Sequence, residues 1–497
     1  MSSQPVVNIR KCGIVVDFGL ADGSAFPACV RDALCHQLTY EYREFLRGND
    51  MYRADGSRSR VRLETRRLYD FNGTRIMTGF GFTPRIASTL ISFGYQITYE
   101  DMYGHRERVN CFNANTSFFN NLTWRPRQQE CLERIIASPG GLISAPPAFG
   151  KSEIIPRLVR AYPEAKFAIA TKRRDVARTL HRRFLKYMSG VGFVGDGDNT
   201  KGRVTIYVAK SLHKADPDVD FFLGDEVHEL ASDSFCEVIV RSFQHARCFG
   251  FSATWNSRAD GTSKRLEYIF GPVIFEMSWQ EATQLGLVVP VEVRWLNVHM
   301  NNNPCAKYSS DVAKKRHGIW CNAKRNKLFA DAAQSFAEDD QVLILVETVE
   351  HAVMLKQYLP EFELCYGDME LDDLHTYQAK GLLPADYEPM TAEKRETLRR
   401  RFEDKDIKKV IATDVWSTGV SFEQLAVLLR ADARSSEILD DQAPGRVVRT
   451  HADSGKSKGI IYDGYDAFDT GFKRKANERM KRYKEKGWTQ IRDYVLE

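Results

Sequence analysis

A short phosphate-loop pattern limits what this chain can fold into. Residues 145–152 read Ala-Pro-Pro-Ala-Phe-Gly-Lys-Ser, between the apolar pair 142–143 and a stretch with helical character at 153–162. A strand, a loop and a helix in this order bring backbone N–H groups and a lysine to phosphates, and a serine hydroxyl to Mg²⁺. A surface turn that opens a helix is the alternative, but it leaves the preceding strand unexplained. The sequence therefore predicts a parallel α/β domain that binds a nucleoside triphosphate.

An acidic pair follows a second apolar run. Residues 219–223 are mostly apolar, and residues 224–228 read Gly-Asp-Glu-Val-His. A buried parallel strand delivers such side chains to the C-terminal edge of its sheet, where they can reach a metal ion and a water molecule. An exposed acidic turn is the alternative, and Asp220 within the run slightly favours it. Together with the loop, the pair predicts hydrolysis of ATP with Mg²⁺, which the Ser152 hydroxyl and the carboxylates of Asp225 and Glu226 can reach.

Length and composition exclude several classes of protein. A chain of 497 residues with 43% hydrophobic content should form about three folded domains. No apolar run approaches the roughly 18 residues that span a bilayer, and the N-terminus lacks a signal-peptide core, so we expect a cytoplasmic protein without a membrane partner. The ten cysteines include no Cys-x-x-Cys pair. This pattern favours reduced thiols over a zinc site or a disulfide framework.

Positive charge is concentrated in two segments. Residues 471–497 hold nine Lys or Arg against four acids, and residues 53–75 hold seven arginines against three acids. Clustered cations beside aromatic residues suit a phosphate backbone, because each neutralised phosphate releases counterions. A solvated helix face is the alternative for each segment. The candidate nucleic-acid contacts in these segments are Arg62, Arg66, Arg67, Lys473, Arg474 and Lys475.

Short apolar runs alternate with amphipathic stretches from about residue 120 onward. The first series of expected strands is 142–143, 167–170, 204–208, 219–223 and 248–251, and the second is 291–298, 342–346, 363–366, 410–412, 426–429 and 459–462. Alternating strands and helices predict parallel sheets covered on both faces, with a linker at 286–290. Before residue 120 we expect a small α+β domain. The expected elements of this domain are strands at 8–18, 60–69 and 95–99 and a helix within 26–47. In the second series of strands, residues 372–389 should form an irregular loop.

A third motif lies in the second series. Gln442, Arg446 and Arg449 are spaced by four and three residues, which places them on one face of a helix. Two guanidinium groups aimed in one direction suit a transferring γ-phosphate. Pairing with surface acids is the alternative, and the phosphate loop upstream argues against it. The polar turn 413–421 follows a strand, as ligand-binding turns at a sheet edge do.

In this order, the motifs resemble those of superfamily 2 helicases and translocases. Motifs Q, I, II, III, IV, V and VI correspond to 125–128, 145–152, 225–228, 252–254, 342–352, 412–422 and 442–449. Within the superfamily, 252–261 and 347–351 are similar to the branch of phage UvsW-type DNA helicases and XPB-like repair helicases, and 61–99 loosely resembles the N-terminal domain of the UvsW type. The resemblance implies two tandem RecA-like parallel-sheet domains preceded by a small α+β domain. The corresponding boundaries are 1–117, 118–288, 289–470 and a basic C-terminal tail at 471–497.

The resemblance also implies a role for individual residues. Gln128 would read adenine, Lys151 would contact the β- and γ-phosphates, and Glu226 would activate the attacking water. Arg446 and Arg449 would be arginine fingers from the second domain. The other implied nucleotide contacts are Arg125, Ala148, Gly150, Ser152 and Gly419; the implied coupling residues are His228, Ser252, Thr254 and Gln442; and the implied strand contacts are Thr413 and Thr418. Pro146, Pro147, the late position of Arg258 and the absence of the usual motif Ia pattern at 172–177 depart from the family.

These observations predict an ATP-dependent DNA helicase or translocase that remodels or branch-migrates forked and recombination DNA. Its expected partners are single-stranded, forked or branched DNA and recombination or replication proteins, and we expect a monomer in the cytoplasm of a bacterial host, if phage-encoded. The alternatives are an RNA helicase of the same superfamily and a double-stranded DNA translocase in a restriction or defence complex. A binding protein with an inactive ATPase remnant is disfavoured, because Lys151, Asp225, Glu226 and both arginines are present.

Overall fold

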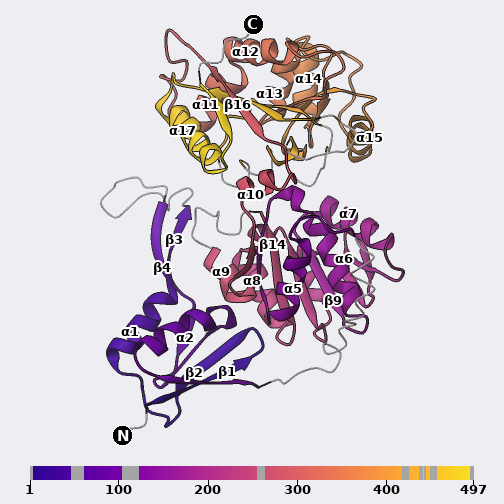
Figure 1. The fold of residues 1–497 in the computed structure, drawn as a ribbon. Helices are drawn as coiled ribbons and strands as arrows, with labels where there is room; N and C mark the ends of the chain where they lie inside the picture. Colours follow the sequence, from indigo (N-terminus) through magenta and orange to yellow (C-terminus); the bar gives the residue numbers. More distant parts are fainter. Residues whose placement is uncertain are drawn as a thin grey trace. The chain divides into compact units, whose positions relative to one another are not determined.

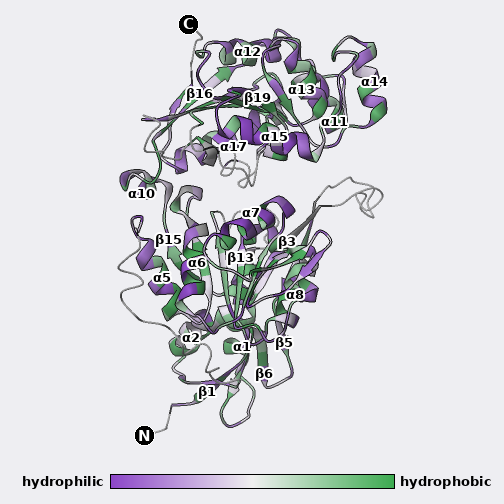
Figure 2. Cartoon of the chain, turned by 90° about the vertical axis from the view of Figure 1, so that its right-hand side faces the viewer, coloured by the Kyte–Doolittle hydropathy of each residue, from purple (hydrophilic) through white to green (hydrophobic). Residues whose placement is uncertain are grey.

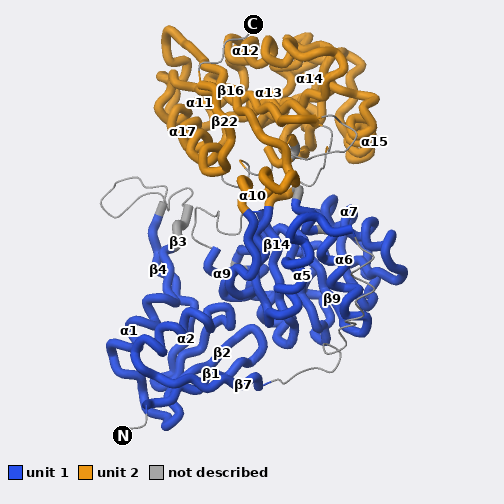
Figure 3. Tube along the Cα trace, in the orientation of Figure 1, with its two compact units in different colours: residues 1–145, 149–277 blue, residues 146–148, 278–497 orange. Residues whose placement is uncertain are grey.

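The structure, a computed structural model, forms two compact units. It describes residues 4–45, 61–102, 123–253, 263–416, 422, 425–435, 440, 444–447 and 456–492. One unit comprises residues 1–145 and 149–277, and the other comprises 146–148 and 278–497 (Figure 3). The first contains an N-terminal α+β domain and the first parallel sheet, and the second contains the second parallel sheet (Figure 1). The boundary predicted between 117 and 118 lies outside the described residues.

In its described residues, the N-terminal domain contains a five-stranded sheet, a two-stranded sheet and two helices. The strand order of the five-stranded sheet is β5-β6-β2-β1-β7, antiparallel except for the parallel pair β1 and β7. Its strands are β1 (Val6–Cys12), β2 (Val15–Leu20), β5 (Tyr69–Phe71), β6 (Arg75–Gly79) and β7 (Gln96–Asp101), and the helices are α1 (Ala28–Gln37) and α2 (Thr83–Ser92). Alternate apolar residues of the strands, such as Val16 and Phe18, pack with Leu34 and Leu90 of the helices in one core.

Two predictions for this domain were wrong in detail. The strand expected over 8–18 is a hairpin of β1 and β2, in which Gly13 adopts φ +70° in the turn. The helix expected within 26–47 ends at Gln37, and the chain continues as β3 (Thr39–Phe45), which pairs with β4 (Val61–Arg67). The sequence of β3, Thr-Tyr-Glu-Tyr-Arg-Glu-Phe, is rich in the aromatic and β-branched residues that strands prefer.

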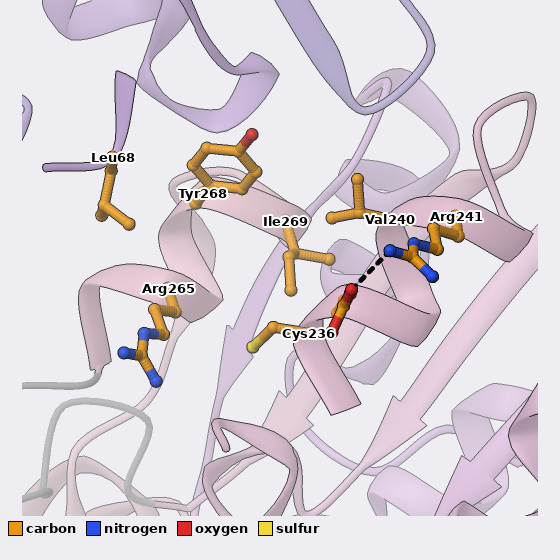
Figure 4. A pocket seen from close by; sticks show the side chains of 8 residues that line it. Leu68, Cys236, Val240, Arg241, Arg265, Tyr268 and Ile269 are labelled. Atoms are coloured by element: carbon orange, nitrogen blue, oxygen red, sulfur yellow. Dashed lines mark ion pairs between the residues drawn. The ribbon is translucent and has the colours of Figure 1, made fainter. Parts of the chain in front are cut away.

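The N-terminal domain packs tightly against α9 (Ser263–Phe270) of the first parallel-sheet domain. The contact is made by the short 3-10 helix η2 (Phe80–Phe82). Arg85 forms an ion pair with Glu267 at 2.5 Å, and Phe82 meets Tyr268 edge to face. Beside this contact lies a pocket of about 320 Å³, into which Leu68 of the N-terminal domain and Tyr268 and Ile269 of α9 project (Figure 4). The two domains therefore share packed side chains.

Enlarging Gly81 should disrupt this contact. A Cβ atom at position 81 would lie 1.7 Å from the backbone oxygen of Glu267, so Gly81→Ala must push η2 away from α9. Overpacking of this kind costs about 1 to 3 kcal/mol. We expect a lower Tm and faster proteolysis between the N-terminal domain and α9. Gly367→Ala is the control, because its Cβ atom would make only an ordinary contact, 3.6 Å from Val415 Cγ1. Equal stability of both variants would contradict the described packing.

The first parallel sheet has eight strands in the order β11-β10-β12-β9-β13-β14-β8-β15, of which only β11 is antiparallel to its neighbour. Its strands are β8 (Gly141–Ser144), β9 (Phe167–Thr171), β10 (Gly192–Gly195), β11 (Asp198–Thr200), β12 (Val204–Val208), β13 (Phe221–Asp225), β14 (Arg247–Ser252) and β15 (Val273–Glu276). The described helices of this parallel-sheet domain are α5 (Gln128–Ala137), α6 (Lys151–Ala161), α7 (Arg174–Leu185), α8 (Asp233–Ser242) and α9. The five expected strands are present. Asp220 is fully buried and accepts a hydrogen bond from the Lys166 backbone N–H, so it does not mark an exposed turn.

The second parallel sheet has seven strands in the order β18-β19-β17-β20-β21-β16-β22, all parallel. Its strands are β16 (Val291–Asn297), β17 (Val342–Leu345), β18 (Glu363–Cys365), β19 (Lys409–Ala412), β20 (Val427–Arg430), β21 (Gly459–Tyr465) and β22 (Thr489–Ile491). The helices of this unit are α10 (Trp279–Gln284), α11 (Asp311–Lys315), α12 (Ala323–Gln334), α13 (Val349–Lys356), α14 (Leu371–Ala379), α15 (Ala392–Glu403) and α17 (Thr470–Glu485). Hydrophobic residues gather on strands such as β13 and β19, and hydrophilic residues on helices such as α7 (Figure 2). The predicted fold class, two parallel-sheet domains after a small α+β domain, is confirmed.

Two segments of the second domain are more ordered than the sequence indicated. The segment 372–389, expected to be an irregular loop, includes most of α14, whose Leu374 packs into the core. The basic segment that begins at residue 471 forms α17 and β22, and β22 pairs with β16. Phe472, Ala476 and Tyr483 of α17 are buried. The basic segment is therefore an integral part of the second domain.

Candidate ATP-hydrolysis site

The phosphate loop adopts the tight turn that its sequence predicts. It runs from the end of β8 through a 3-10 turn at Pro147–Phe149 to Gly150, and α6 begins at Lys151. Gly150 has φ +85°, a left-handed conformation that glycine adopts without a steric penalty. A Cβ atom at this position would also lie 2.6 Å from Gln128 Nε2. A larger residue at position 150 would therefore displace the loop. The side chains of Ala148 and Ser152 lie outside the described part of the chain.

Lys151 lies between the loop and the acidic pair. Its side chain is buried, and Nζ donates a hydrogen bond to the Ala145 carbonyl oxygen at 3.0 Å. Glu226 Oε1 lies 3.8 Å from the same nitrogen. The loop and the end of β13 thus meet at one place, where the ammonium group can exchange a carbonyl oxygen for a phosphate.

The acidic pair is held in an electrostatically costly arrangement. Burial, together with the neighbouring Glu226 charge, raises the pKa of Asp225 to about 7, although Lys151 opposes the shift. Glu226 has φ 49° and ψ 53°, a left-handed conformation that is uncommon for a residue other than glycine. Such strain persists where the surrounding structure enforces it, often at active sites. In the described residues, the buried Glu226 Oε2 has no hydrogen-bond partner.

These two carboxylates fit a magnesium ion that shares its coordination with a nucleotide. Among the described residues, no group of three or more His, Cys, Asp or Glu side chains could form a complete metal cage. Mg²⁺ usually takes one or two carboxylates and completes its shell with waters and substrate phosphates. Asp225, whose carboxylate is destabilised by burial, and Glu226 Oε2, which accepts no hydrogen bond from the described residues, suit such an ion and its waters.

Gln128 anchors the phosphate loop. Gln128 is buried at the first position of α5, and its Nε2 donates a hydrogen bond to the Phe149 carbonyl oxygen at 2.8 Å. Its Oε1 accepts hydrogen bonds from the Arg125 backbone N–H at 3.1 Å and from Arg157 Nη1 at 3.0 Å. The sequence did not indicate this anchoring role, nor that of Arg157, because both arise from contacts across the fold. The reading of adenine by Gln128 stays a prediction.

A buried hydrogen bond connects two of the predicted coupling residues. His228 Nδ1 lies 2.7 Å from Ser252 Oγ, and both residues have no exposed surface. The same nitrogen lies 3.4 Å from Glu226 Oε2. His228 therefore connects the end of β14 to the catalytic candidate Glu226, as coupling would require. The third residue of this group in the first domain, Thr254, lies outside the described residues.

The second domain is described in less detail at its predicted motifs. Thr413 is buried directly after β19, and its backbone N–H donates to the Cys365 carbonyl oxygen at 2.9 Å. The backbone of Arg446 ends a 3-10 turn at Pro444–Arg446, and its side chain lies outside the described part. Thr418, Gly419, Gln442 and Arg449 are also outside it. The arrangement of the two arginines on one face stays a prediction.

The candidate nucleic-acid contacts differ in their surroundings. On β4, Arg62 and Arg66 lie 2.9 Å and 3.6 Å from Glu64, and Arg67 is exposed. On α17, Lys473 is exposed and Arg474 pairs with Glu478 at 2.7 Å. Lys475 is half-buried, and burial lowers its pKa. Lys473 and Arg474 are therefore better placed than Lys475 to contact phosphates.

Comparisons with known proteins match both parallel-sheet domains. Residues 121–257 match the family "Type III restriction enzyme, res subunit", and residues 324–451 match "Helicase conserved C-terminal domain". The chain is 22% identical to the ATP-dependent DNA helicase uvsW of Enterobacteria phage T4 in an alignment 486 residues long, which covers 90% of this chain and 91% of the relative.

Solved structures are similar in fold. A structure of S. cerevisiae Dbp5 bound to RNA and ADP BeF3 has a TM-score of 0.51 at 14% identity, covering 78% of this chain and 94% of that chain. A crystal structure of T4 UvsW has a TM-score of 0.42 at 17% identity, covering 98% of this chain and 99% of that chain.

Within the described ranges, every helix is too short or too polar to span a bilayer.

The two matched families correspond to the two halves of a helicase motor. They follow one another in the chain, and each falls on one of the parallel sheets. The phosphate loop and the acidic pair lie within the first match, and Arg446 and Arg449 lie within the second. With its two RecA-like domains, this chain is an ATP-dependent helicase of superfamily 2 that resembles the UvsW type.

Proposed function

We propose that this helicase acts on DNA and uses ATP hydrolysis to remodel or branch-migrate forked and recombination intermediates. The observation that carries the proposal is the alignment with the phage T4 DNA helicase over 90% of this chain and 91% of the relative. An alignment of this length includes most of the N-terminal domain as well as the motor. The Dbp5 structure, which contains RNA, covers a smaller share, 78% of this chain. Partners would be branched DNA and recombination or replication proteins, with a monomer as the acting form.

The proposed chemistry divides among residues of both domains. Lys151 and the loop N–H groups would bind the β- and γ-phosphates, and Ser152 and Asp225 would hold Mg²⁺, which neutralises phosphate charge when bound. Glu226 would orient the attacking water and accept its proton, using the oxygen that has no hydrogen-bond partner in the described residues.

Hydrolysis would depend on both domains. Arg446 and Arg449 would stabilise the charge that develops on the transferred phosphoryl group, and Lys151 would hold that group in place. Because the two arginines belong to the second domain and Lys151 to the first, the chemical step would require the domains to come together. Nucleic acid contacted by both domains, through residues such as Thr413 and Thr418, would then be gripped differently before and after hydrolysis.

The experiment that tests the proposal compares nucleic acids as activators. ATPase rates are measured with single-stranded DNA, duplex DNA, four-way junctions and RNA, together with strand separation of the junction. We expect the largest stimulation with branched DNA, and separation of the junction only with hydrolysable ATP. Stimulation by RNA alone would show an RNA helicase instead.

One observation favours a second candidate function. The family matched by residues 121–257 is named after a type III restriction subunit. A translocase in such a complex would move on duplex DNA without separating its strands. Stimulation by duplex DNA with no loss of the junction would therefore favour this candidate over the proposed one.

The exposed cations of α17 should contribute to nucleic-acid affinity. Removing Lys473 and Arg474 together should weaken binding to all sequences and flatten the slope of log K against log salt by roughly 0.7 to 0.9 for each lost phosphate contact. Salt titrations of binding to single-stranded and forked DNA measure this slope. The matched control removes Lys394 and Arg400, two exposed cations of α15 in the same domain. If the α17 variant and the α15 control have equal salt slopes, Lys473 and Arg474 make no phosphate contact and belong to an ordinary solvated helix face.

The N-terminal cations should affect branched DNA more than single strands. Replacing Arg62, Arg66 and Arg67 with alanine should weaken binding to forked or duplex DNA and flatten its salt slope, while ATP hydrolysis without DNA persists. The same titrations, made with forked and single-stranded DNA side by side, test this difference. Identical slopes for the variant and the unaltered protein on forked DNA would remove β4 from the proposed interface.

A further inference from the structure

A group of buried charged side chains lies at the C-terminal edge of the second sheet, outside the proposed ATP and nucleic-acid contacts. It consists of four arginines and three aspartates: Arg430, Asp432, Arg434, Asp440, Asp463, Arg479 and Arg482. All except Arg434 and Arg482 are at most 3% exposed. Burial opposes the ionisation of Asp432, but the charges of Arg430 and Arg434 outweigh it and lower its pKa to about 2. Asp432 is thus ionised at neutral pH, whereas burial raises the pKa of Asp463.

Asp440 is the member of this group that lies next to motif VI, and it is held from two sides. Its Oδ1 accepts a hydrogen bond from Arg430 Nη1 at 2.5 Å, and its Oδ2 accepts one from Arg482 Nη1 at 2.6 Å. Its backbone carbonyl oxygen accepts a third hydrogen bond, from Lys486 Nζ at 2.5 Å. Arg430 ends β20, Arg482 lies in α17 and Lys486 caps that helix. Strand and helix together therefore fix both carboxylate oxygens and the backbone of Asp440.

The chain after Asp440 is fixed again at Val447. Val447 has no exposed surface, and its N–H donates to the Pro444 carbonyl oxygen at 3.0 Å. A Cβ atom at Gly459, the first residue of β21, would lie 2.6 Å from the Val447 carbonyl oxygen, so the two segments pack backbone to backbone. Arg446 precedes Val447 directly and follows Asp440 by six residues. Asp440 and Val447, two described residues on either side of Arg446 in the chain, are thus each held by contacts within the second domain.

The chemistry of the anchor suits positioning better than stability. A buried ion pair gains little net stability, because desolvation of the charges offsets most of their attraction. Charge-assisted hydrogen bonds to both carboxylate oxygens instead impose one geometry. A catalytic group needs such a fixed position, since displacement of the group by about 1 Å can lower the rate about 100-fold.

We infer that Asp440, held between Arg430 and Arg482, is a positioning residue for the segment that carries Arg446. This inference rests on the proposed role of Arg446 in hydrolysis. It adds α17, a helix distant in sequence from the ATP-binding motifs, to the elements that determine the rate of the chemical step. Arg482 is the residue through which it can be tested, because it is the most accessible member of the group, with 23% of its side chain exposed.

The test compares Arg482→Gln with Arg482→Lys and with the control Arg400→Gln, which removes an exposed arginine of α15. Steady-state ATP hydrolysis is measured with saturating DNA. We expect Arg482→Gln to lower kcat about 10- to 100-fold with little change in KM for ATP. Arg482→Lys, which keeps the charge, should recover most of the rate, and Arg400→Gln should have none of this effect. An unchanged kcat in Arg482→Gln, or a loss matched by an equal loss of folded protein in a thermal melt, would overturn the inference.

A double-mutant cycle separates this inference from the function on which it rests. In a protein that already carries Arg446→Ala, adding Arg482→Gln should lower kcat no further, because the group to be positioned is absent. If the two losses multiply instead, Arg482 acts independently of Arg446 and the positioning role is wrong. If Arg446→Ala alone hydrolyses ATP at the normal rate, the proposed role of Arg446 itself is wrong.

Discussion

Replacing Glu226 with glutamine should lower kcat for ATP hydrolysis by at least about 100-fold. Glutamine has the same size and can keep the left-handed backbone of this position, but it cannot accept a proton from the attacking water. Replacing Lys151 with alanine should have an effect of similar size, because the ammonium group within 3.8 Å of Glu226 is lost together with its phosphate contact. Mg²⁺-dependent phosphate release under saturating DNA measures both effects.

Glu229→Gln is the control for these variants. Glu229 lies three residues after Glu226, in the 3-10 turn (Val227–Leu230) that Glu226 caps, and its pKa is raised by burial. It has no proposed part in hydrolysis, so its replacement should leave kcat close to that of the unaltered protein. Near-normal turnover by folded Glu226→Gln or Lys151→Ala, with Tm unchanged, would remove these residues from the catalytic site.

Replacing Arg446 or Arg449 with alanine should slow hydrolysis by about 1000-fold while nucleotide affinity changes little. An arginine finger interacts mainly with charge that develops in the transition state, so its loss appears in the chemical step. Single-turnover hydrolysis and equilibrium binding of a non-hydrolysable ATP analogue separate these two quantities.

Arg400→Ala serves as the control for the arginine variants, since it removes an exposed guanidinium from the same domain without a proposed catalytic role. A fall in analogue affinity alone would identify Arg446 and Arg449 as ligands of the ground state. Unchanged hydrolysis in both variants would show that their spacing in the sequence does not reflect a shared phosphate contact.

The central parallel strands, such as β9 and β12, were predictable because they are buried on both faces. Such a strand is a continuous apolar run, and the run predicted at 204–208 coincides with β12. The strand β22 was missed, since its three residues, Thr-Gln-Ile, are too few to show a pattern. The hairpin of β1 and β2 was read as one strand because Gly13 is a weak turn signal between two runs of similar polarity.

The phosphate loop and acidic pair were predictable as local motifs, but their supports were not. The hydrogen bond from Gln128 to Phe149 and the ion pairs of Asp440 join residues that only the folded topology brings together. One signal was present in the sequence: Arg430 and Asp463 directly follow the apolar runs of β20 and β21 and still belong to these strands. Charged side chains inside such strands are rarely buried unless paired, so each required a partner elsewhere in the chain.

The pairing of α17 and β22 with the rest of the second domain has a consequence for synthesis on the ribosome. The strand β16 at residues 291–297 cannot pair with β22 until residues 489–491 have been synthesised. Asp440 and Asp463 cannot form their ion pairs with Arg482 and Arg479 until α17 has been synthesised. Until residues 470–491 leave the exit tunnel, Asp440 is paired with Arg430 alone, Asp463 lacks its ion pair with Arg479, and one edge of the sheet is open. The first unit can fold while the chain is still growing, whereas the second should stay incomplete and prone to aggregation until that late segment arrives.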